Sequence, residues 1–360
     1  MEHTEDIVMM LEQISDPAFL VQDGIITQVN PSAQRVLIET GSDIASLLAT
    51  GTQEYADFRG GYLALTLKLG TQLCNASVTR LENCDLFVLN HEQDQAELQS
   101  MALAAQELRS PLSSVLAVAE QLFPLIGAQN DQKALDNVAQ INRGLFQMLR
   151  IIGNMSDAYQ YSQDSSSRFE TRDVCRIMDE LFSGLMPLTE HINIRLHYDS
   201  PQKPEFCLVD VEKLERAVYN IVSNALKFTP AGGTIEARLT RRRNMLYLTV
   251  ENTGTNASGL SPASFYRQHL RQPGLSDSRF GIGLGMVLIH ATATAHGGTV
   301  LLEQTQSGST RITMSMAMRQ RTDPDVRETI IHVDYAGGHD HRLLELSESL
   351  PPDLYGISNH

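Results

Sequence analysis

Two long stretches of apolar residues at helical spacing constrain the fold of this 360-residue chain more than any other feature. In each stretch the apolar side chains recur three and four positions apart, which predicts an amphipathic helix. The first stretch, from about Glu92 until Pro124 and Gly127 end it, contains Leu98, Met101, Ala105, Leu108, Leu112, Val115, Ala119 and Leu122. The second, from about Asp131, contains Leu135, Val138, Ile141, Leu145, Met148, Ile152, Met155 and Tyr159. Two antiparallel helices cannot bury both stripes alone, so we expect a second chain to complete a dimeric four-helix bundle.

The first ninety residues carry the patterns of short strands. Ala18 to Gln22 and Ile25 to Val29 flank Asp23-Gly24, which supplies the positive φ of a tight hairpin turn. Tyr62 to Leu69 alternates with a period of two, and residues 73–80 and 85–90 fit further strands. This order, with the sequence from Asp23 to Pro31, resembles a PAS-type sensor domain. No Cys or His stands out as an anchor for flavin or haem, and a ligand-free dimerisation module is the alternative interpretation.

Three polar residues on one predicted helix have the chemistry of a phosphate and metal site. Asn220, Asn224 and Lys227 are spaced four and then three, so they share one helical face, while Ile221, Val222, Ala225 and Leu226 turn toward a core. Two carboxamides and an ammonium can hold a hydrated metal ion and the phosphates that it bridges. A surface helix whose polar residues face water is the alternative.

A glycine-rich stretch supplies the second half of this candidate site. Gly281, Gly283 and Gly285 open an apolar run that ends in Ala-His-Gly-Gly at 295–298. Such glycines let backbone N–H groups approach an anion at a helix N-terminus. Together the two stretches resemble the N and G2 boxes of sensor histidine kinases, whose ATP-binding domain has the Bergerat-type α/β sandwich shared with gyrase, a heat-shock chaperone and a mismatch-repair ATPase. The resemblance covers about Arg168 to Arg319 and implies ATP and Mg²⁺ as cofactors, with Asn224 as the magnesium ligand and Lys227 near phosphate.

The stretch after a predicted strand at 245–251 departs from the family's G1 box. The aspartate that receives the adenine amino group in this family is Asn252 here, Gly254 is retained, and Asn256 replaces the second glycine. Exchange of a charged for a neutral hydrogen bond costs roughly 1 kcal/mol, about fivefold in affinity, so we expect weaker ATP binding and not its loss. Residues 257–280 are then expected to form the lid over the nucleotide. His296 is expected to pack the end of its helix.

The first long helix contains a motif whose phosphoacceptor is missing. Gln106-Glu-Leu-Arg-Ser-Pro-Leu112 resembles the histidine kinase H box, which usually begins with His. An imidazole nitrogen has a free lone pair for attack on the γ-phosphorus, whereas the lone pair of an amide nitrogen is delocalised. We therefore expect no autophosphorylation at Gln106.

The same motif keeps residues that are associated with dephosphorylation in the family. Glu107 and Ser110 keep the spacing of the acid and the Thr or Asn that help such kinases dephosphorylate their partner response regulator. A hydroxyl or carboxamide can orient a water for in-line attack on an aspartyl phosphate, so Ser110 and Gln106 are candidates for this role. Solvent-facing helix residues without a role are the alternative.

Composition limits the remaining functions. The formal charge of −15 argues against nucleic acid as a partner, and Arg241 to Arg243, the basic run, fits a solvated strand connection. No apolar segment is long enough for a membrane span, and Met1 to Met10 lacks the features of a signal peptide, so we expect a cytoplasmic protein. The four cysteines lack metal or disulfide spacing and are expected to be reduced.

The sequence thus predicts an α+β multidomain protein. It consists of a PAS-like domain with an antiparallel sheet at 1–90, a helical hairpin that forms a dimer at 91–165, an ATP-binding domain at 168–319 and a tail of unassigned role at 320–360. Within the tail we expect a strand at 329–333 and a short amphipathic helix from Arg342 to Leu350. The resemblance implies two-component signalling by a pseudokinase, as a homodimer or a heterodimer with another kinase, with a response regulator as partner. The alternatives are a regulator phosphatase, a non-catalytic scaffold, and a kinase that acts in trans on the histidine of a partner.

Overall fold

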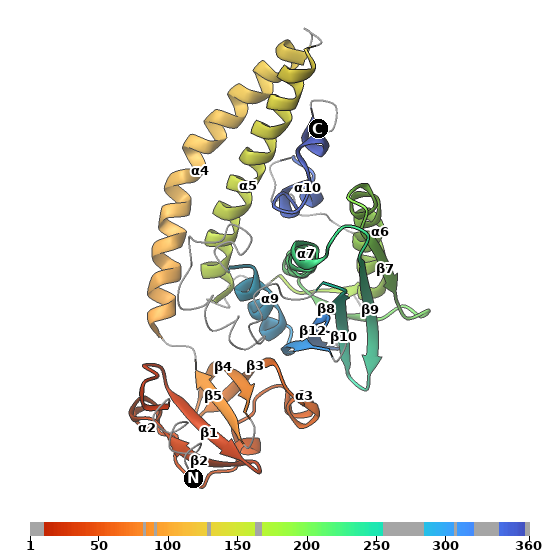
Figure 1. Cartoon of the computed structure of the whole chain (residues 1–360). Helices are drawn as coiled ribbons and strands as arrows, with labels where there is room; N and C mark the ends of the chain where they lie inside the picture. The colour runs from red at the N-terminus through yellow and green to blue at the C-terminus, as the bar shows by residue number, and fades with distance from the viewer. Residues whose placement is uncertain are drawn as a thin grey trace.

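The computed structural model describes residues 11–81, 84–89, 92–127, 131–162, 168–254, 284–305, 308–319 and 338–356, with backbone alone at 92–97 and 162. Figure 1 shows a sheet domain at the N-terminal end, a long helical hairpin, and a second α/β domain beside the hairpin. No helix in these ranges is long and apolar enough to cross a membrane.

The N-terminal domain is the antiparallel sheet that the period-two patterns predict. Its strands are β1(Ala18–Gln22), β2(Ile25–Val29), β3(Tyr62–Leu69), β4(Gln72–Arg80) and β5(Asp85–Leu89), in the order β2-β1-β5-β4-β3. The short helices α2(Pro31–Arg35), η1(Ile44–Ser46) and α3(Thr52–Asp57) lie between the second and third strands. Asp23 and Gly24 have φ of 50° and 80°, as the hairpin turn requires. The PAS assignment itself remains a prediction.

The hairpin consists of α4(Glu92–Gly127) and α5(Gln132–Ser162). Helix α4 continues through Pro124 and ends at Gly127. Its apolar stripe is wider than one partner helix covers. Ala105, Leu112 and Ala119 are buried, whereas the residues one turn further along, Leu108, Val115 and Leu122, are about half exposed at 51, 54 and 49%. The structure therefore leaves a second apolar face on α4, as the expected four-helix bundle requires.

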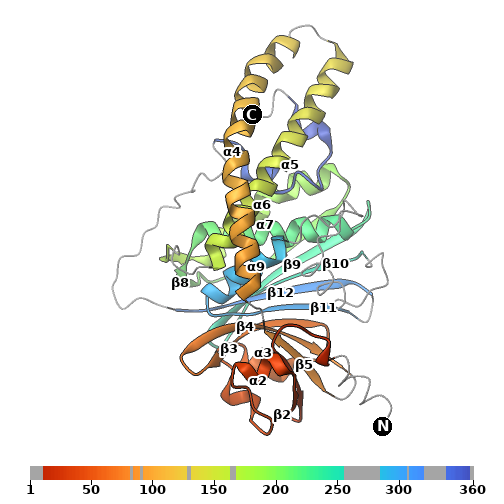
Figure 2. The same ribbon diagram turned by 90° about the vertical axis from the view of Figure 1, so that its left-hand side faces the viewer.

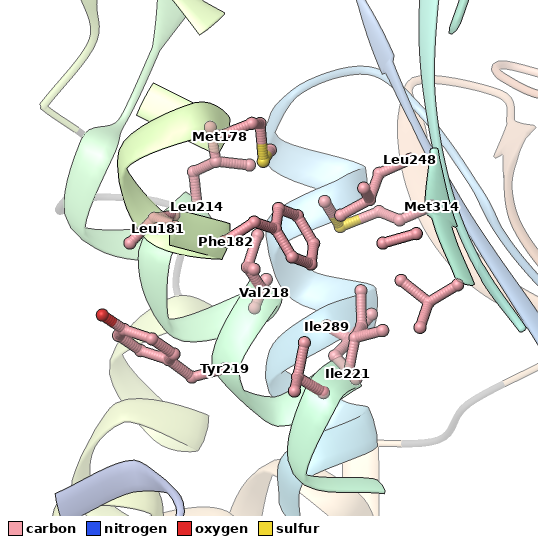
Figure 3. Packing of buried hydrophobic residues seen from close by; sticks show 14 of the residues in the cluster. Met178, Leu181, Phe182, Leu214, Val218, Tyr219, Ile221, Leu248, Ile289 and Met314 are labelled. Atoms are coloured by element: carbon pink, nitrogen blue, oxygen red, sulfur yellow. The ribbon is translucent and has the colours of Figure 1, made fainter. Parts of the chain in front are cut away.

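The C-terminal α/β domain places three helices on one face of a mixed sheet, as expected. Its strands are β6(Glu170–Asp173), β7(Arg195–Asp199), β8(Phe206–Val209), β9(Thr234–Arg242), β10(Met245–Asn252), β11(Val300–Gln304) and β12(Thr310–Ala317), and its helices are α6(Val174–His191), α7(Val211–Phe228) and α9(Leu284–Ala295). β7 and β9 run parallel, whereas β9, β10, β12 and β11 pair antiparallel. Phe182, Val218, Ile221, Ile289 and Leu248 meet in the core between helices and sheet (Figure 3). β8 lies outside the main sheet and pairs with β6.

The two sheets join into one sheet of ten strands. Edge strand β3 of the N-terminal domain pairs antiparallel with edge strand β11, through Tyr62, Leu63 and Ala64 opposite Leu302, Leu301 and Val300 (Figure 2). The pairing needs a glycine at Gly61, which has φ of +95° and where an added Cβ would lie 2.2 Å from the Leu302 carbonyl oxygen. The sequence predicted separate domains and gave no indication of this junction.

The C-terminal segment, which we define as residues 338–356, packs into the core of the α/β domain between α5 and the helices α6 and α7 (Figure 1). It contains α10(His341–Glu345) and the turn η2(Pro352–Tyr355). The helix expected over Arg342 to Leu350 is thus shorter than predicted, because the chain turns after Glu345 and buries Leu346 and Leu350. The strand expected at 329–333 lies outside the described residues.

Candidate functional site

Helix α7 carries the candidate site on one face and the core on the other. Asp210 caps its N-terminus by accepting a hydrogen bond from the Lys213 backbone N–H at 3.2 Å. Ile221, Val222, Ala225 and Leu226 are buried in the hydrophobic core, as the spacing predicts. The opposite face turns Asn220 and Lys227 toward α5 and the C-terminal segment, and Asn224 toward α9.

Asn220 and Asn224 meet the N-terminal end of α9. An added Cβ at Gly285 would lie 2.7 Å from the Asn220 side-chain oxygen, so this close approach requires glycine. The Asn224 side-chain nitrogen lies 3.4 Å from the sulfur of Met286. The structure therefore brings the predicted residues Asn220, Asn224 and Gly285 together. Gly281, Gly283 and the lid predicted at 257–280 lie outside the described residues.

Other parts of the protein cover the polar face of α7. The alternative interpretation, a surface helix whose polar residues face water, is therefore wrong. Asn220 is 1% exposed, donates to the Arg216 carbonyl oxygen at 2.8 Å and accepts from Arg150 of α5 at 3.3 Å. Lys227 forms an ion pair with Glu348 of the C-terminal segment. Burial lowers the pKa of the Lys227 ammonium, and Glu348 opposes that effect.

Asn252 and Gly254 lie where β10 meets the end of α7. An added Cβ at Gly254 would overlap the Phe228 carbonyl oxygen at 1.4 Å, so glycine is required there by packing alone. Asn252 is 4% exposed. With its nitrogen toward Thr310 and its oxygen toward Gly254, it donates to the Thr310 carbonyl oxygen and accepts from the Gly254 N–H, each at 3.2 Å. Asn252 thus has a structural role at the end of β10, in addition to any contact with the adenine base of a nucleotide.

His296 packs the end of its helix, as expected. It is 2% exposed. Its Nε2 accepts from the Asp210 backbone N–H at 3.1 Å, which leaves Nδ1 to donate to the Thr292 carbonyl oxygen at 2.7 Å. His296 therefore ties α9 to the N-terminus of α7 and has no free nitrogen for catalysis.

Sequence reasoning missed a cluster of charges beside Asn220. Arg150 of α5 pairs with Glu345 and Glu348, and Arg216 of α7 pairs with Glu345 and with Asp157. Both arginine side chains are 4% exposed. A signal was present, because Arg143, Gln147, Arg150, Asn154 and Asp157 recur at helical spacing along α5 and form a polar stripe beside the apolar one. Each of them contacts α7 or the C-terminal segment.

Gln106, Glu107 and Ser110 lie together on an exposed face of α4, accessible to a partner protein. The four cysteines are free, but only Cys175 and Cys207 are buried. Burial raises the pKa of Cys175 to about 11 and of Cys207 to about 12, which makes these two thiols poor nucleophiles.

The donor set near α7 fits a magnesium ion that is held mainly by phosphate. Asn224 offers one carboxamide oxygen, and among the residues that the structure describes no group of three His, Cys, Asp or Glu side chains is placed to hold a metal. Mg²⁺ commonly keeps several waters and takes one or two protein ligands plus substrate phosphates.

Comparison with known proteins agrees with this geometry. Residues 209–320 match the family described as "Histidine kinase-, DNA gyrase B-, and HSP90-like ATPase". Hybrid signal transduction histidine kinase D of Dictyostelium discoideum is 24% identical over 240 residues, which are 64% of this chain and 15% of that protein. Histidine protein kinase DivJ of Caulobacter vibrioides is 27% identical over 244 residues, 63% of this chain and 40% of that protein.

Residues 209–320 thus belong to this ATPase family, and the chain is a homologue of sensor histidine kinases. It spans less than half the length of these two kinases. Among solved structures, full-length ShkA in complex with AMPPNP has a TM-score of 0.49 and 17% identity, covering 62% of this chain and 47% of that chain. Histidine kinase ThkA in complex with response regulator TrrA has a TM-score of 0.42 and 13% identity, covering 86% and 97%.

Proposed function

We propose that this sensor histidine kinase homologue binds ATP with Mg²⁺ and signals in a two-component system without phosphorylating itself. The observation that carries the proposal is Gln106, which stands at the phosphoacceptor position of an otherwise recognisable motif. Its amide nitrogen lacks the free lone pair that attacks phosphorus. The chain is thus a pseudokinase in cis.

The contacts of α7 and α9 support the nucleotide half of the proposal. Asn220, Asn224 and Gly285 converge in a part of the chain that matches an ATPase family, and Lys227 lies on the same helical face. Asn224 is the residue that would hold Mg²⁺, and Gly285 opens the helix whose N-terminus would face phosphate. A bound Mg²⁺ would neutralise charge on the phosphates. Asn252 would contact the base, with the weakened affinity argued above.

The exposed face of α4 supports dimerisation. Leu108, Val115 and Leu122 follow one another at intervals of seven residues and remain about half exposed in the single chain. Burial of each such side chain stabilises an association by about 1 kcal/mol, since roughly half of the 1.5–3 kcal/mol for full burial is still available. A second copy or another kinase would complete the bundle. In a heterodimer the bound ATP would serve the partner's histidine in trans.

A second candidate function rests on the exposure of Glu107 and Ser110 on α4. A response regulator that docks there would meet a carboxylate and a hydroxyl at the spacing used for dephosphorylation, and Ser110 would orient a water toward the aspartyl phosphate. Unchanged decay of a phosphorylated cognate regulator in the presence of the chain would remove this function. A scaffold that binds no nucleotide remains an alternative function. A cytoplasmic location remains a prediction.

The test of the main proposal is calorimetric titration of ATP with Mg²⁺ into the wild-type chain and into Asn224→Ala. Saturable binding that the variant loses is the expected result, because the variant removes the proposed magnesium ligand. Asn75→Ala, in a half-buried position on β4 of the N-terminal domain, is the matched control and should bind as wild type does. If titration of the wild-type chain with millimolar ATP gives only the heat of dilution, ATP does not bind, and the scaffold or the phosphatase is favoured.

A further inference from the structure

The C-terminal segment lies beside the candidate site, and its apolar side chains are buried in the core of the α/β domain. Leu343, Leu344, Leu346, Leu350 and Tyr355 are each no more than 5% exposed and belong to the core of the α/β domain. Polar side chains of α5 bind backbone carbonyl groups of the segment. Asn142 donates to the Tyr355 carbonyl oxygen at 3.1 Å, and Arg143 donates to the carbonyl oxygens of residues 347 and 348 at 3.0 and 3.1 Å. The segment is therefore docked, with a fixed position against α5 and α7.

Two carboxylates of the docked segment bind the cations at the candidate site. Glu348 Oε2 lies 3.0 Å from Arg150 Nη1 and pairs with Lys227 as well. Glu345, which is fully buried, lies 3.3 Å from Arg150 Nε and 3.4 Å from Arg216 Nε. Arg150 in turn donates to Asn220. Arg150 therefore links the two carboxylates to Asn220, the residue whose side chain packs on Gly285.

The docked segment supplies most of the carboxylates that pair with the cations of this cluster. The cations are Arg150, Arg216 and Lys227, and they pair with the carboxylates of Asp157, Glu345 and Glu348. Two of those three carboxylates come from the C-terminal segment. When the segment leaves, Arg150 and Lys227 lose these carboxylates and become available to another anion. Two guanidinium groups beside an ammonium match the oxygens of a phosphate chain.

We propose that the C-terminal segment is an internal competitor of ATP, with Glu345 and Glu348 occupying the cations that bind the nucleotide's phosphates. This inference rests on the proposed ATP binding and deepens it, because it assigns Arg150 of the hairpin to the phosphate site and makes release of the segment a condition for binding. Burial alone would raise the pKa of the Glu348 carboxyl, but Arg150 and Lys227 hold it below its usual value, so Glu348 remains an anion in the docked state.

The test compares ATP affinities of Glu348→Gln and Asp353→Asn by calorimetry with Mg²⁺. Each variant neutralises one carboxylate of the same segment, but Asp353 is exposed and pairs with His191, away from the cluster. Glu348→Gln should bind ATP at least tenfold more tightly than wild type, and Asp353→Asn should match wild type within twofold. Adding Arg150→Gln to Glu348→Gln should weaken binding again by at least tenfold.

Hydrogen exchange of the wild-type chain gives a second measurement that needs no variant. Saturating ATP should speed exchange of backbone amides at 341–355, because the segment leaves its site. ATP binding with equal affinity in all variants, or with unchanged exchange at 341–355, overturns the competition and leaves the proposed function standing. Absence of ATP binding in both wild type and Glu348→Gln overturns the proposed function together with the inference.

Discussion

The guanidinium of Arg150 donates to the side-chain oxygen of Asn220 across 3.3 Å, so the helical hairpin touches the helix that carries the candidate site. Arg150 also pairs with Glu345 and Glu348. One side chain therefore joins α5, α7 and the C-terminal segment. Any rearrangement of the hairpin changes the surroundings of Asn220, which gives the hairpin a direct physical connection to the site.

Arg216 should be among the most sensitive positions for stability. Its guanidinium pairs with Asp157 and Glu345 and donates to the Asn154 side chain at 3.0 Å, in a buried cluster. Arg216→Met leaves two carboxylates without this cation, which we expect to lower the free energy of unfolding by about 3–5 kcal/mol. Arg176→Ala is the control, because its pair with Glu180 is exposed and should matter by less than about 1 kcal/mol. Urea unfolding measures both, and similar losses would contradict the account.

Alanine substitution of two neighbouring glycines at the junction of the two sheets should have very different effects on stability. Gly61→Ala places a Cβ 2.2 Å from the Leu302 carbonyl oxygen at a positive φ, and should destabilise the chain by about 2–5 kcal/mol. Gly60→Ala meets nothing within 4 Å and should change stability by less than about 0.5 kcal/mol. Thermal unfolding followed by calorimetry should also show whether the N-terminal domain melts separately in Gly61→Ala. Equal stability of the two variants would mean that β3 does not pair with β11 in solution.

Stability should fall between pH 6.5 and about 4 because of buried histidines. Burial lowers the pKa of His290 from 6.5 to about 4, and burial also lowers that of His296. As the pH falls below 6.5 the unfolded chain takes up a proton that the folded chain excludes at His290, so the free energy of unfolding decreases, by up to about 3 kcal/mol at this residue. His290→Leu should reduce the slope of stability against pH in this window. An unchanged slope in urea unfolding at several pH values would show that His290 titrates alike in both states.

Local patterns predicted most of the secondary structure. The strand at Tyr62–Leu69 has the boundaries that its period of two indicates, and Asp23-Gly24 forms the expected hairpin. The alternation also predicts a half-buried strand, which is wrong: residues 62–67 are all buried, because one face packs in the N-terminal domain and the other in the core of the α/β domain. On α7 the spacing separated the core face from the polar face correctly. Such patterns depend on neighbouring residues within one helix or strand, so a single sequence is enough to recognise them.

Contacts between distant segments were not predictable in the same way. The pairing of β3 with β11 joins residues more than 230 positions apart, and the alternating pattern of each strand indicates only a strand within its own domain. Glu345 and Glu348 look like surface residues of an amphipathic segment, but their cations come from α5 and α7. Arg150 had a local signal in the polar stripe of α5, although its partners had none. Burial of Asn220 followed from these same contacts.

The central claim, a competent nucleotide site beside a missing phosphoacceptor, is tested most directly by Gln106→His. The variant is incubated with γ-labelled ATP and Mg²⁺, alone and combined with Glu348→Gln, next to wild type and to Gln106→Asn. We expect acid-labile label in the histidine variants, more in the combined one, and none in wild type or Gln106→Asn. Label on the wild-type chain, or its absence from both histidine variants, would contradict the account.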